Sequence, residues 1–256
     1  MALSRGHAAV LQIARSHDPA LRTQIQSALN GSYNAYSIVV KRSLSAIEAW
    51  RDFQPSIFVF QRQIQIALAA SGKRVMNDVY DYQIGALGLT RSPAVRGLKS
   101  ALAGLANSIA AEDSIEITQT TLATALRAQS FYINDGVKGK PKSLAYYLER
   151  TKGGIGERRA NTIAGNENHI AAQEALAFIA EWLSRNNVGV YQQWKSRRDS
   201  KVRPTHRRAN GQTVPIGELF QVGDALLRFP GDPEGPAEET INCRCSIVLT
   251  TKKPKP

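Results

Sequence analysis

Apolar residues recur at spacings of three and four through most of the first half of the chain. This period places apolar side chains on one face of a helix, which a globular protein buries against its core. The pattern predicts helices over residues 8–14, 21–29, 36–50 and 57–82. Because glycine weakens a helix interior, we expect a break at Gly31, and the last helix is either continuous or divided near Gly72.

The middle of the chain continues the helical pattern and then changes in composition. Serine is a good N-cap and proline fits the first helical turn, so Ser92-Pro93 predicts the entrance to a helix over 95–110. A further helix is expected over 118–129. The segment 134–142 is rich in glycine, proline and lysine, a composition that suits neither helix nor strand. This segment predicts a domain boundary.

The C-terminal part mixes helical and strand patterns. Helical spacing predicts a short helix over 144–149 and a long one over 158–183, with Asn186-Asn187 ending the latter. Residues 188–194 alternate apolar and polar side chains, which is typical of a half-buried strand. Short apolar segments between proline and glycine turns predict further strands over 212–216, 225–229 and 246–250.

These elements predict an α+β fold, with a mainly α-helical N-terminal part followed by a small mixed module that has a long helix and short antiparallel strands. We expect a helical domain over 1–137, the mixed module over 143–250 and a basic tail over 251–256. No stretch reaches the roughly 18 apolar residues of a membrane span, and the N-terminal residues lack the apolar core of a signal peptide. We therefore expect a soluble protein with no membrane partner.

The charge of the chain points to a polyanionic partner. Its formal net charge is +12 and its pI is about 9.9, and a net positive field favours association with nucleic acid. Seven basic residues and one acidic residue lie between Lys195 and Arg208. The segment is either a solvated loop or a surface that contacts the phosphates of double-stranded DNA without sequence specificity. The candidate contacts are Lys195, Arg197, Arg198, Lys201, Arg207 and Arg208.

The two cysteines, Cys243 and Cys245, are one residue apart. A disulfide between them would close a small strained ring, so a metal or a reducing compartment fits better than a secreted disulfide framework. Zinc takes Cys sulfur and His nitrogen in four-coordinate sites. His206 is a third candidate ligand and Asp199 a fourth. Alternatively, the cysteines are small buried apolar residues, His206 bonds locally, and Asp199 pairs with an arginine, Arg203 or Arg244.

Two further features of this region predict structure rather than chemistry. Trp194 is expected to anchor the core of the module rather than to stack on a ligand. Asn210-Gly211 predicts a type I′ hairpin turn, because both central residues of that turn need positive φ.

The order of these residues resembles a known family. Trp194 is followed by Asp199, Val202-Arg203 and His206, and then by Asn210-Gly211, Pro230-Gly231-Asp232 and Asn242-Cys243-Arg244-Cys245. The chain thereby resembles phage head morphogenesis proteins of the Mu F-like class, the minor head (minor capsid) proteins of tailed phages. The resemblance covers about residues 155 to 250, with one departure at Gly165-Asn166-Glu167, where related chains often have Arg-Thr-Glu. It assigns motif positions of structural importance to Trp194, Arg203, Asn210, Gly211, Asp232, Asn242 and Arg244.

The resemblance implies a structural protein of the virion and not an enzyme. Members of the family are present in few copies inside the head near the portal, after synthesis in the host cytoplasm. They act in head assembly, DNA packaging or DNA delivery. The implied partners are the portal protein, capsid or scaffold proteins, and double-stranded DNA.

Two other function classes are weighed against this one. The first is a metal-dependent nuclease or other hydrolase, in which the Asp/His/CxC cluster holds a metal that activates water; the chain has no HExxH motif and no glycine-rich phosphate loop. The second is a cellular DNA-binding regulator, for which no helix-turn-helix pattern stands out. Presence in purified heads would separate the structural protein from both.

Overall fold

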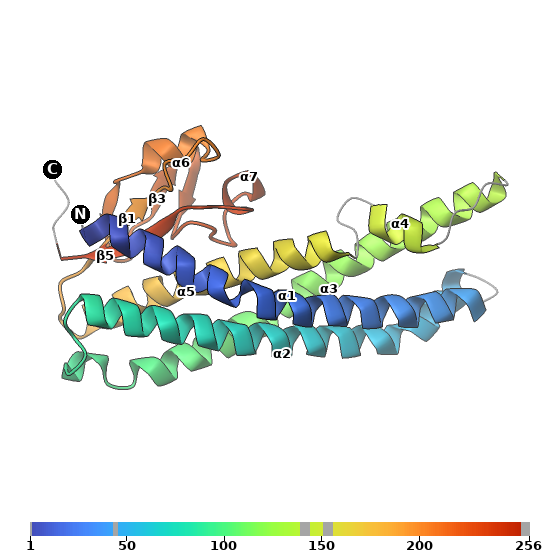
Figure 1. The fold of residues 1–256 in the computed structure, drawn as a ribbon, viewed down its shortest axis with the longest axis horizontal. Helices are drawn as coiled ribbons and strands as arrows, with labels where there is room; N and C mark the ends of the chain where they lie inside the picture. The colour runs from blue at the N-terminus through green and yellow to red at the C-terminus, as the bar shows by residue number, and fades with distance from the viewer. Residues whose placement is uncertain (1, 43–45, 139–143, 151–155, 252–256) are drawn as a thin grey trace. The chain divides into compact units, whose positions relative to one another are not determined.

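The computed structural model describes residues 2–42, 46–138, 144–150 and 156–251 (Figure 1). Five helices of seven residues or more account for most of this part of the chain: α1 (Ala2–Arg42), α2 (Ala46–Ala86), α3 (Leu98–Val137), α4 (Leu144–Arg150) and α5 (Glu157–Arg185). No helix in the described ranges is both long enough and apolar enough to cross a membrane.

The N-terminal helices are longer than the sequence pattern predicts. Gly31 lies inside α1 and Gly72 inside α2, so the predicted break at Gly31 is wrong and α2 is continuous. A helical glycine costs only about 1 kcal/mol of stability relative to alanine. The packing of a 41-residue helix contributes more stability than this cost removes. At Gly72 an added Cβ would lie 3.5 Å from Cβ of Ala106 on α3, an ordinary van der Waals contact, so the packing of α2 against α3 does not require glycine there.

Two predicted boundaries in the middle of the chain are corrected. Ser92 does accept a hydrogen bond from the backbone of Ala94, but it caps a short 3₁₀ helix, η1 (Pro93–Val95), and α3 begins only after Gly97, whose φ is +79°. The predicted linker begins too early, because α3 continues through residues 134–137. Residues 139–142 of the predicted boundary and residues 252–256 of the basic tail lie outside the described residues.

The chain forms two compact units. The first combines residues 1–18, 71–107 and 165–256, and the second combines 19–70 and 108–164. The units therefore differ from the predicted domains 1–137 and 143–250, because each draws on both sides of residues 138–142. The division falls inside α1, α2, α3 and α5, and in α1 it coincides with Pro19.

The second unit is built from helices alone among its described residues. Its core contains apolar side chains of α1, α2 and α3, among them Leu21, Ile25 and Ile64, together with Leu148 of α4. The guanidinium of Arg159 on α5 donates to the hydroxyl groups of Thr120 (2.7 Å) and Thr121 (2.9 Å) on α3. These contacts give the helical unit its own apolar core and a polar attachment for α5.

The first unit carries all of the strands that the structure describes. A three-stranded antiparallel sheet has the order β2 (Thr213–Pro215), β1 (Tyr191–Lys195), β5 (Ser246–Thr250). A separate hairpin pairs β3 (Phe220–Val222) with β4 (Ala225–Leu227), and two short helices, α6 (Pro204–Ala209) and α7 (Ala237–Thr240), lie in the connections. The predicted α+β fold class is confirmed.

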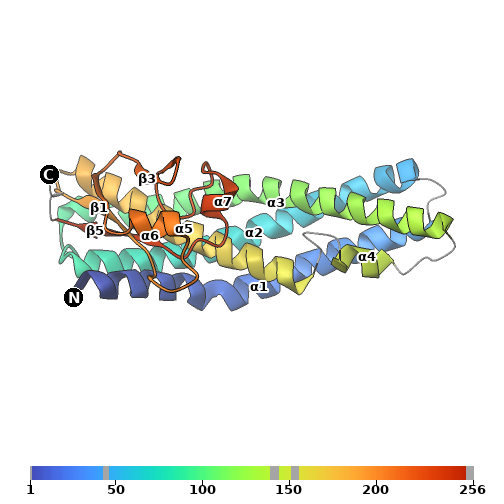
Figure 2. The same ribbon diagram turned by 90° about the horizontal axis from the view of Figure 1, so that it is seen from above.

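The sheet packs on the C-terminal half of α5, which lies in the same unit (Figures 1 and 2). Every residue of β5 is buried, and the amide of Ile247 donates to the side-chain carbonyl of Gln173 on α5 at 2.9 Å. Trp194 lies opposite Ile247 in the sheet and is fully buried, as predicted, with its ring edge-on to Phe220 at 5.4 Å between centroids. This core holds the segment on which the candidate site lies.

A buried polar network also anchors α5 within this unit. The amide of Asn168 on α5 donates to the Asp18 carboxylate of α1 at 3.0 Å and accepts from the Ser71 hydroxyl of α2 at 2.7 Å. Asn168 and Ser71 are almost completely buried, where an unpaired polar group would cost about 1 to 3 kcal/mol. The network therefore fixes the rotation of α5 about its axis. It thereby also sets the direction in which the side chain of the next residue, His169, leaves the helix.

Candidate functional site

The two cysteines and His206 meet in a buried cluster. His206 lies on α6, which begins at Pro204, and the cysteines lie in the extended segment that leads into β5. Nδ1 of His206 is 3.3 Å from Sγ of Cys245 and 3.5 Å from Sγ of Cys243. His206 and Cys245 are each 1% exposed. The structure thus brings together three of the four residues predicted as metal ligands.

A carboxylate on α7 holds the other side of the His206 ring. Nε2 of His206 is 2.9 Å from Oε2 of Glu239, and the Thr205 hydroxyl donates to the same oxygen at 2.9 Å. An N–H donor at Nε2 satisfies this carboxylate and leaves the lone pair of Nδ1 facing the two sulfur atoms. The ring also lies edge-on to Trp194, with 5.5 Å between centroids.

The two thiols share one environment but have opposite pKa shifts. The pKa of Cys243 lies well below its usual value, because Cys245 hydrogen-bonds to it and the side chains of His169 and His206 add to that effect against the cost of burial. The same contact with Cys243, together with burial, raises the pKa of Cys245. The opposite directions belong to the pair, because the hydrogen bond that the two sulfur atoms share favours one as acceptor and the other as donor.

Asp199, the fourth predicted ligand, lies elsewhere. Its carboxylate forms a two-point ion pair with Arg244, with O–N distances of 2.9 and 2.5 Å, and is 3.4 Å from Nε of Arg197. Burial alone would raise its pKa, but the backbone N–H of Lys201 and the charge of Arg244 outweigh burial and lower it. Among the described residues, the group close enough to share a metal ion contains His206, Cys243 and Cys245 without Asp199.

His169, which was not among the predicted ligands, lies beside the cluster but outside the group of three residues close enough to share a metal ion. It lies on α5, is 8% exposed, and its side chain contributes to the low pKa of Cys243. A signal was present in the sequence: Leu176 follows it by seven residues, so His169 lies on the buried stripe of α5. Glu239 gave no such signal, because α7 has only four residues.

The motif residues around the cluster hold the cysteine segment in place. Nη2 of Arg203 donates to the carbonyl of Ile241 at 2.5 Å, and the amide of Asn242 donates to Oδ1 of Asn166 on α5 at 3.3 Å. Asn242 has a φ of +55°, a left-handed conformation that asparagine adopts more readily than most residues. These contacts fix the chain immediately before Cys243.

The turn at Asn210-Gly211 differs from the predicted type. Asn210 has φ −61° and ψ 121°, Gly211 has φ +95°, and the amide of Gln212 donates to the carbonyl of Ala209 at 3.0 Å. These values describe a type II turn and not a type I′ turn. The reason is that Ala209 ends α6 instead of a strand. The Asn210 side chain accepts from the amide of Ser196 at 2.9 Å, so the turn remains tied to the end of β1.

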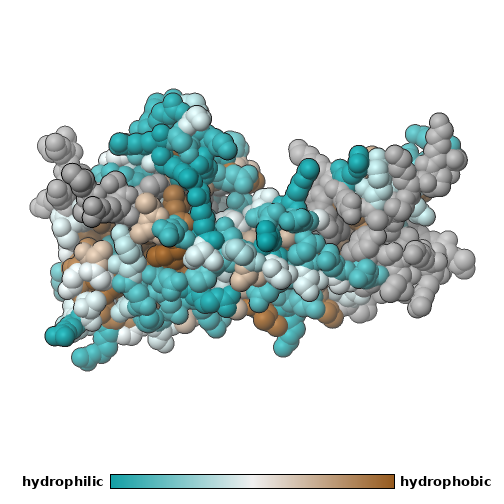
Figure 3. Space-filling model, in the orientation of Figure 1, coloured by the Kyte–Doolittle hydropathy of each residue, from teal (hydrophilic) through white to brown (hydrophobic). Residues whose placement is uncertain are grey.

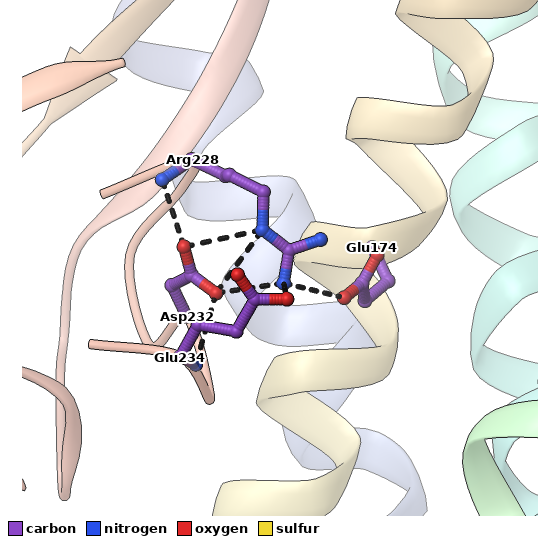
Figure 4. A network of polar contacts seen from close by, with 4 residues as sticks. All are labelled: Glu174, Arg228, Asp232 and Glu234. Atoms are coloured by element: carbon purple, nitrogen blue, oxygen red, sulfur yellow. Dashed lines mark hydrogen bonds and ion pairs between the residues drawn. The ribbon is translucent and has the colours of Figure 1, made fainter. Parts of the chain in front are cut away.

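Asp232 is the centre of a second polar network (Figure 4). Its carboxylate accepts from Nη2 of Arg228 at 2.7 Å, from the backbone amide of Arg228 at 2.9 Å and from that of Glu234 at 3.3 Å. Glu174 of α5 is 3.7 Å from the same guanidinium. Burial opposes the charge of Arg228, but Asp232 and then Glu174 outweigh it and raise its pKa. The network attaches the turn after β4 to α5.

The predicted basic residues lie on the surface around α6. Arg197, Arg198, Lys201, Arg207 and Arg208 are exposed, and Lys195 is half-buried. The pKa of Lys195 is lowered by burial and by the nearby charge of Arg198. Arg15 of α1 is also exposed, and its pKa is lowered first by burial and then by the charges of Arg197 and Arg244. We call these seven residues, the six predicted ones and Arg15, the basic surface.

Comparison with known proteins gives one match. The family model described as "Phage Mu protein F like protein" matches residues 106–248, more than half of the chain and including the cluster, its motif residues and most of the basic surface. No curated protein and no solved structure matches the chain. This chain belongs to the family of phage Mu protein F-like proteins, which are phage head proteins.

Proposed function

We propose that this protein is a minor structural protein of a tailed-phage head that lies inside the capsid near the portal. It acts there in head assembly and in DNA packaging or delivery, and it contacts double-stranded DNA without sequence specificity. Membership in the Mu F-like family supports the role in the head. The basic surface is the observation that carries the DNA contact.

The electrostatics of the basic surface favour a phosphate ligand. Arg15 and Lys195 both have lowered pKa values, and in both cases neighbouring arginines contribute after burial. Cations that repel one another in the free protein gain electrostatic stabilisation when an anion is placed between them. The surface over α6 is hydrophilic (Figure 3), and large exposed aromatic side chains are not among its residues. Contact with the DNA backbone fits this composition better than stacking on bases.

A second surface supports contact with another head protein. Phe58, Val59 and Ile66 on α2 are large apolar side chains with more than half of their surface exposed. Spacings of seven and eight residues place them on one side of the helix. Exposed apolar groups of this kind on a helix face are typical of a protein contact. We assign this face to the portal protein or to a capsid or scaffold protein.

Purified heads test the proposed location. Mass spectrometry of heads from the phage that encodes this chain should detect it in a few copies per particle, and density for it should adjoin the inner portal surface. Gently opened particles should retain it with the portal fraction. Heads that contain the major capsid protein and portal but none of this chain would overturn the proposal.

Salt-dependent DNA binding tests the basic surface. Replacing Arg198, Lys201 and Arg208 together by glutamine should weaken binding to any duplex sequence. Since each phosphate contact contributes about 0.9 to the salt slope for duplex DNA, three lost contacts should reduce the slope of log Kobs against log salt by about 2 to 3. The measurement is fluorescence anisotropy of a labelled duplex over a range of salt concentrations, with two unrelated sequences.

The matched control removes the same charge elsewhere. Arg74, Arg91 and Arg96 are exposed and lie on α2 and in the segment between α2 and α3. Their triple replacement by glutamine changes the net charge equally and should leave the salt slope within about 0.5 of the original value. An equal loss in both triple variants would show that net charge, and not the basic surface, determines binding.

A further inference from the structure

The spacing of the cluster atoms matches that of a tetrahedral zinc site. With Zn–S bonds of about 2.3 Å and Zn–N bonds of about 2.0 to 2.1 Å, a tetrahedral ion separates its nitrogen and sulfur ligands by about 3.6 Å. The two distances from Nδ1 of His206, 3.3 Å to Cys245 and 3.5 Å to Cys243, are within a few tenths of an ångström of that value. A zinc ion requires only a small expansion of the cluster.

The contact with Glu239 orients His206 as metal sites require. Histidine ligands usually donate their second ring N–H to a carboxylate, which fixes the tautomer and makes the ligating nitrogen more basic. Nε2 of His206 has such a partner in Glu239 at 2.9 Å, and the Thr205 hydroxyl holds the same carboxylate oxygen. The ligating atom and its supporting shell are therefore both in place.

The fourth position points to His169. His169 lies three residues after Asn166 on α5, and Asn166 accepts from the amide of Asn242, the residue before Cys243. The Nε2 atom of His169 is fully buried with no hydrogen-bond partner in the part of the chain that the structure describes. Such an atom is rare in a folded protein, because a buried imidazole nitrogen normally finds a donor or an acceptor. Gly231, whose φ is +87°, leaves space for this ring, since a Cβ added there would lie 3.1 Å from the Cδ2 atom of His169. The ring nitrogens of His169 are not close enough to the other three ligand atoms to share an ion with them as the side chains stand, so a shared ion requires this ring to turn toward the sulfur atoms.

We propose that His169, His206, Cys243 and Cys245 form a closed structural zinc site. The four ligands come from α5, from α6 and from the segment before β5, three stretches that are far apart in the sequence. Cys₂His₂ is an established ligand set for structural zinc, whereas catalytic sites keep one position open to water. All four side chains are buried. The ion fastens the strand-bearing part of the unit to α5.

The test uses the full chain produced in zinc-supplemented medium. Elemental analysis should find about one zinc per chain after exhaustive dialysis. X-ray absorption spectroscopy at the zinc edge should then show two sulfur and two nitrogen ligands, with outer-shell scattering from two imidazoles. A first shell with one imidazole would remove His169 from the site. Less than about a tenth of a zinc per chain, together with no uptake of added zinc, would overturn the site altogether.

Cobalt substitution tests His169 by mutation. The wild-type protein loaded with Co²⁺ should show the intense visible bands of tetrahedral coordination and thiolate charge-transfer bands. In His169→Ala the thiolate bands should persist, the visible bands should weaken as water enters, and zinc affinity should fall by about 100-fold or more, since even outer-shell partners contribute about 10- to 100-fold.

His17→Ala is the matched control, because His17 lies in the same unit but pairs with Asp78 of α2 at 2.9 Å. It should leave the spectrum and the affinity unchanged. A His169→Ala spectrum identical to that of the wild type would overturn the assignment. If His169→Ala fails to fold, the absorption spectrum of the wild-type protein still decides the number of imidazoles.

Discussion

Replacement of Trp194 by alanine is expected to lower the free energy of unfolding of the strand-bearing unit by about 3 to 5 kcal/mol, the range measured when large aromatic residues are truncated in protein cores. Trp194 is fully buried in β1, the central strand of the sheet, and lies opposite Ile247 of β5. Its ring contacts the rings of Phe220 and His206. Truncation therefore opens a cavity between the sheet, the β3–β4 hairpin and the cluster.

Hydrogen exchange with mass spectrometry can assign this loss to one unit. In Trp194→Ala the amides of β1 and β5 should exchange faster, while peptides from the core of the helical unit, such as those around Ile25 and Ile64, should keep their protection. Trp194→Phe retains an aromatic ring in the same place and should cost about 1 to 2 kcal/mol. Equal, small effects of both variants would contradict the role of Trp194 as the anchor of this core.

The helices were predictable in kind but not in extent. Periodicity identified α4 and α5 almost to the residue, because each has a clear apolar stripe and an end signal such as Asn187, whose φ is +59°. The break expected at Gly31 is absent, and of the two alternatives at Gly72 the continuous helix is the one observed, for the same energetic reason. The cost of one glycine, about 1 kcal/mol, is local, whereas the packing that keeps a long helix continuous is summed over many turns.

The short elements could not be predicted from the pattern of apolar and polar residues. β3 has three residues and α7 has four, each less than two full periods of its pattern, so no repeat can be recognised in the sequence. α6 did carry a signal in Arg203-Pro204, since proline is favoured at the first helical position. The wrong turn type at Asn210-Gly211 followed from missing this helix, because a hairpin turn was assumed where α6 ends.

The candidate site was predictable only in part. The sequence selected His206, Cys243 and Cys245 because they are concentrated in one segment, and the structure brings them together. Asp199 lies in the same sequence segment as His206, but its carboxylate forms a two-point ion pair with Arg244 instead of joining the cysteines. His169 lies 37 positions before His206, and only the packing of α5 against the cysteine segment reveals its proximity.

Replacement of Asp232 by alanine is expected to cost about 2 to 4 kcal/mol, somewhat less than the 3 to 5 kcal/mol of a fully buried broken ion pair. The carboxylate is almost completely buried and accepts from the guanidinium of Arg228 and from two backbone amides. The cost is moderated because the guanidinium is 41% exposed and keeps Glu174 nearby. The two amides, however, lose their acceptor.

Two variants separate charge from hydrogen bonding at this position. Asp232→Asn keeps one acceptor oxygen but loses the charge, so it should cost about half as much, roughly 1 to 2 kcal/mol. Glu234→Gln is the matched control: its side chain is 80% exposed and lies 3.6 Å from the same guanidinium, so it should change stability by less than about 0.5 kcal/mol. Urea unfolding of the three variants measures these differences. If Glu234→Gln cost as much as Asp232→Ala, the long-range charge of the turn would be the source of stability, and the buried hydrogen bonds of Asp232 would not.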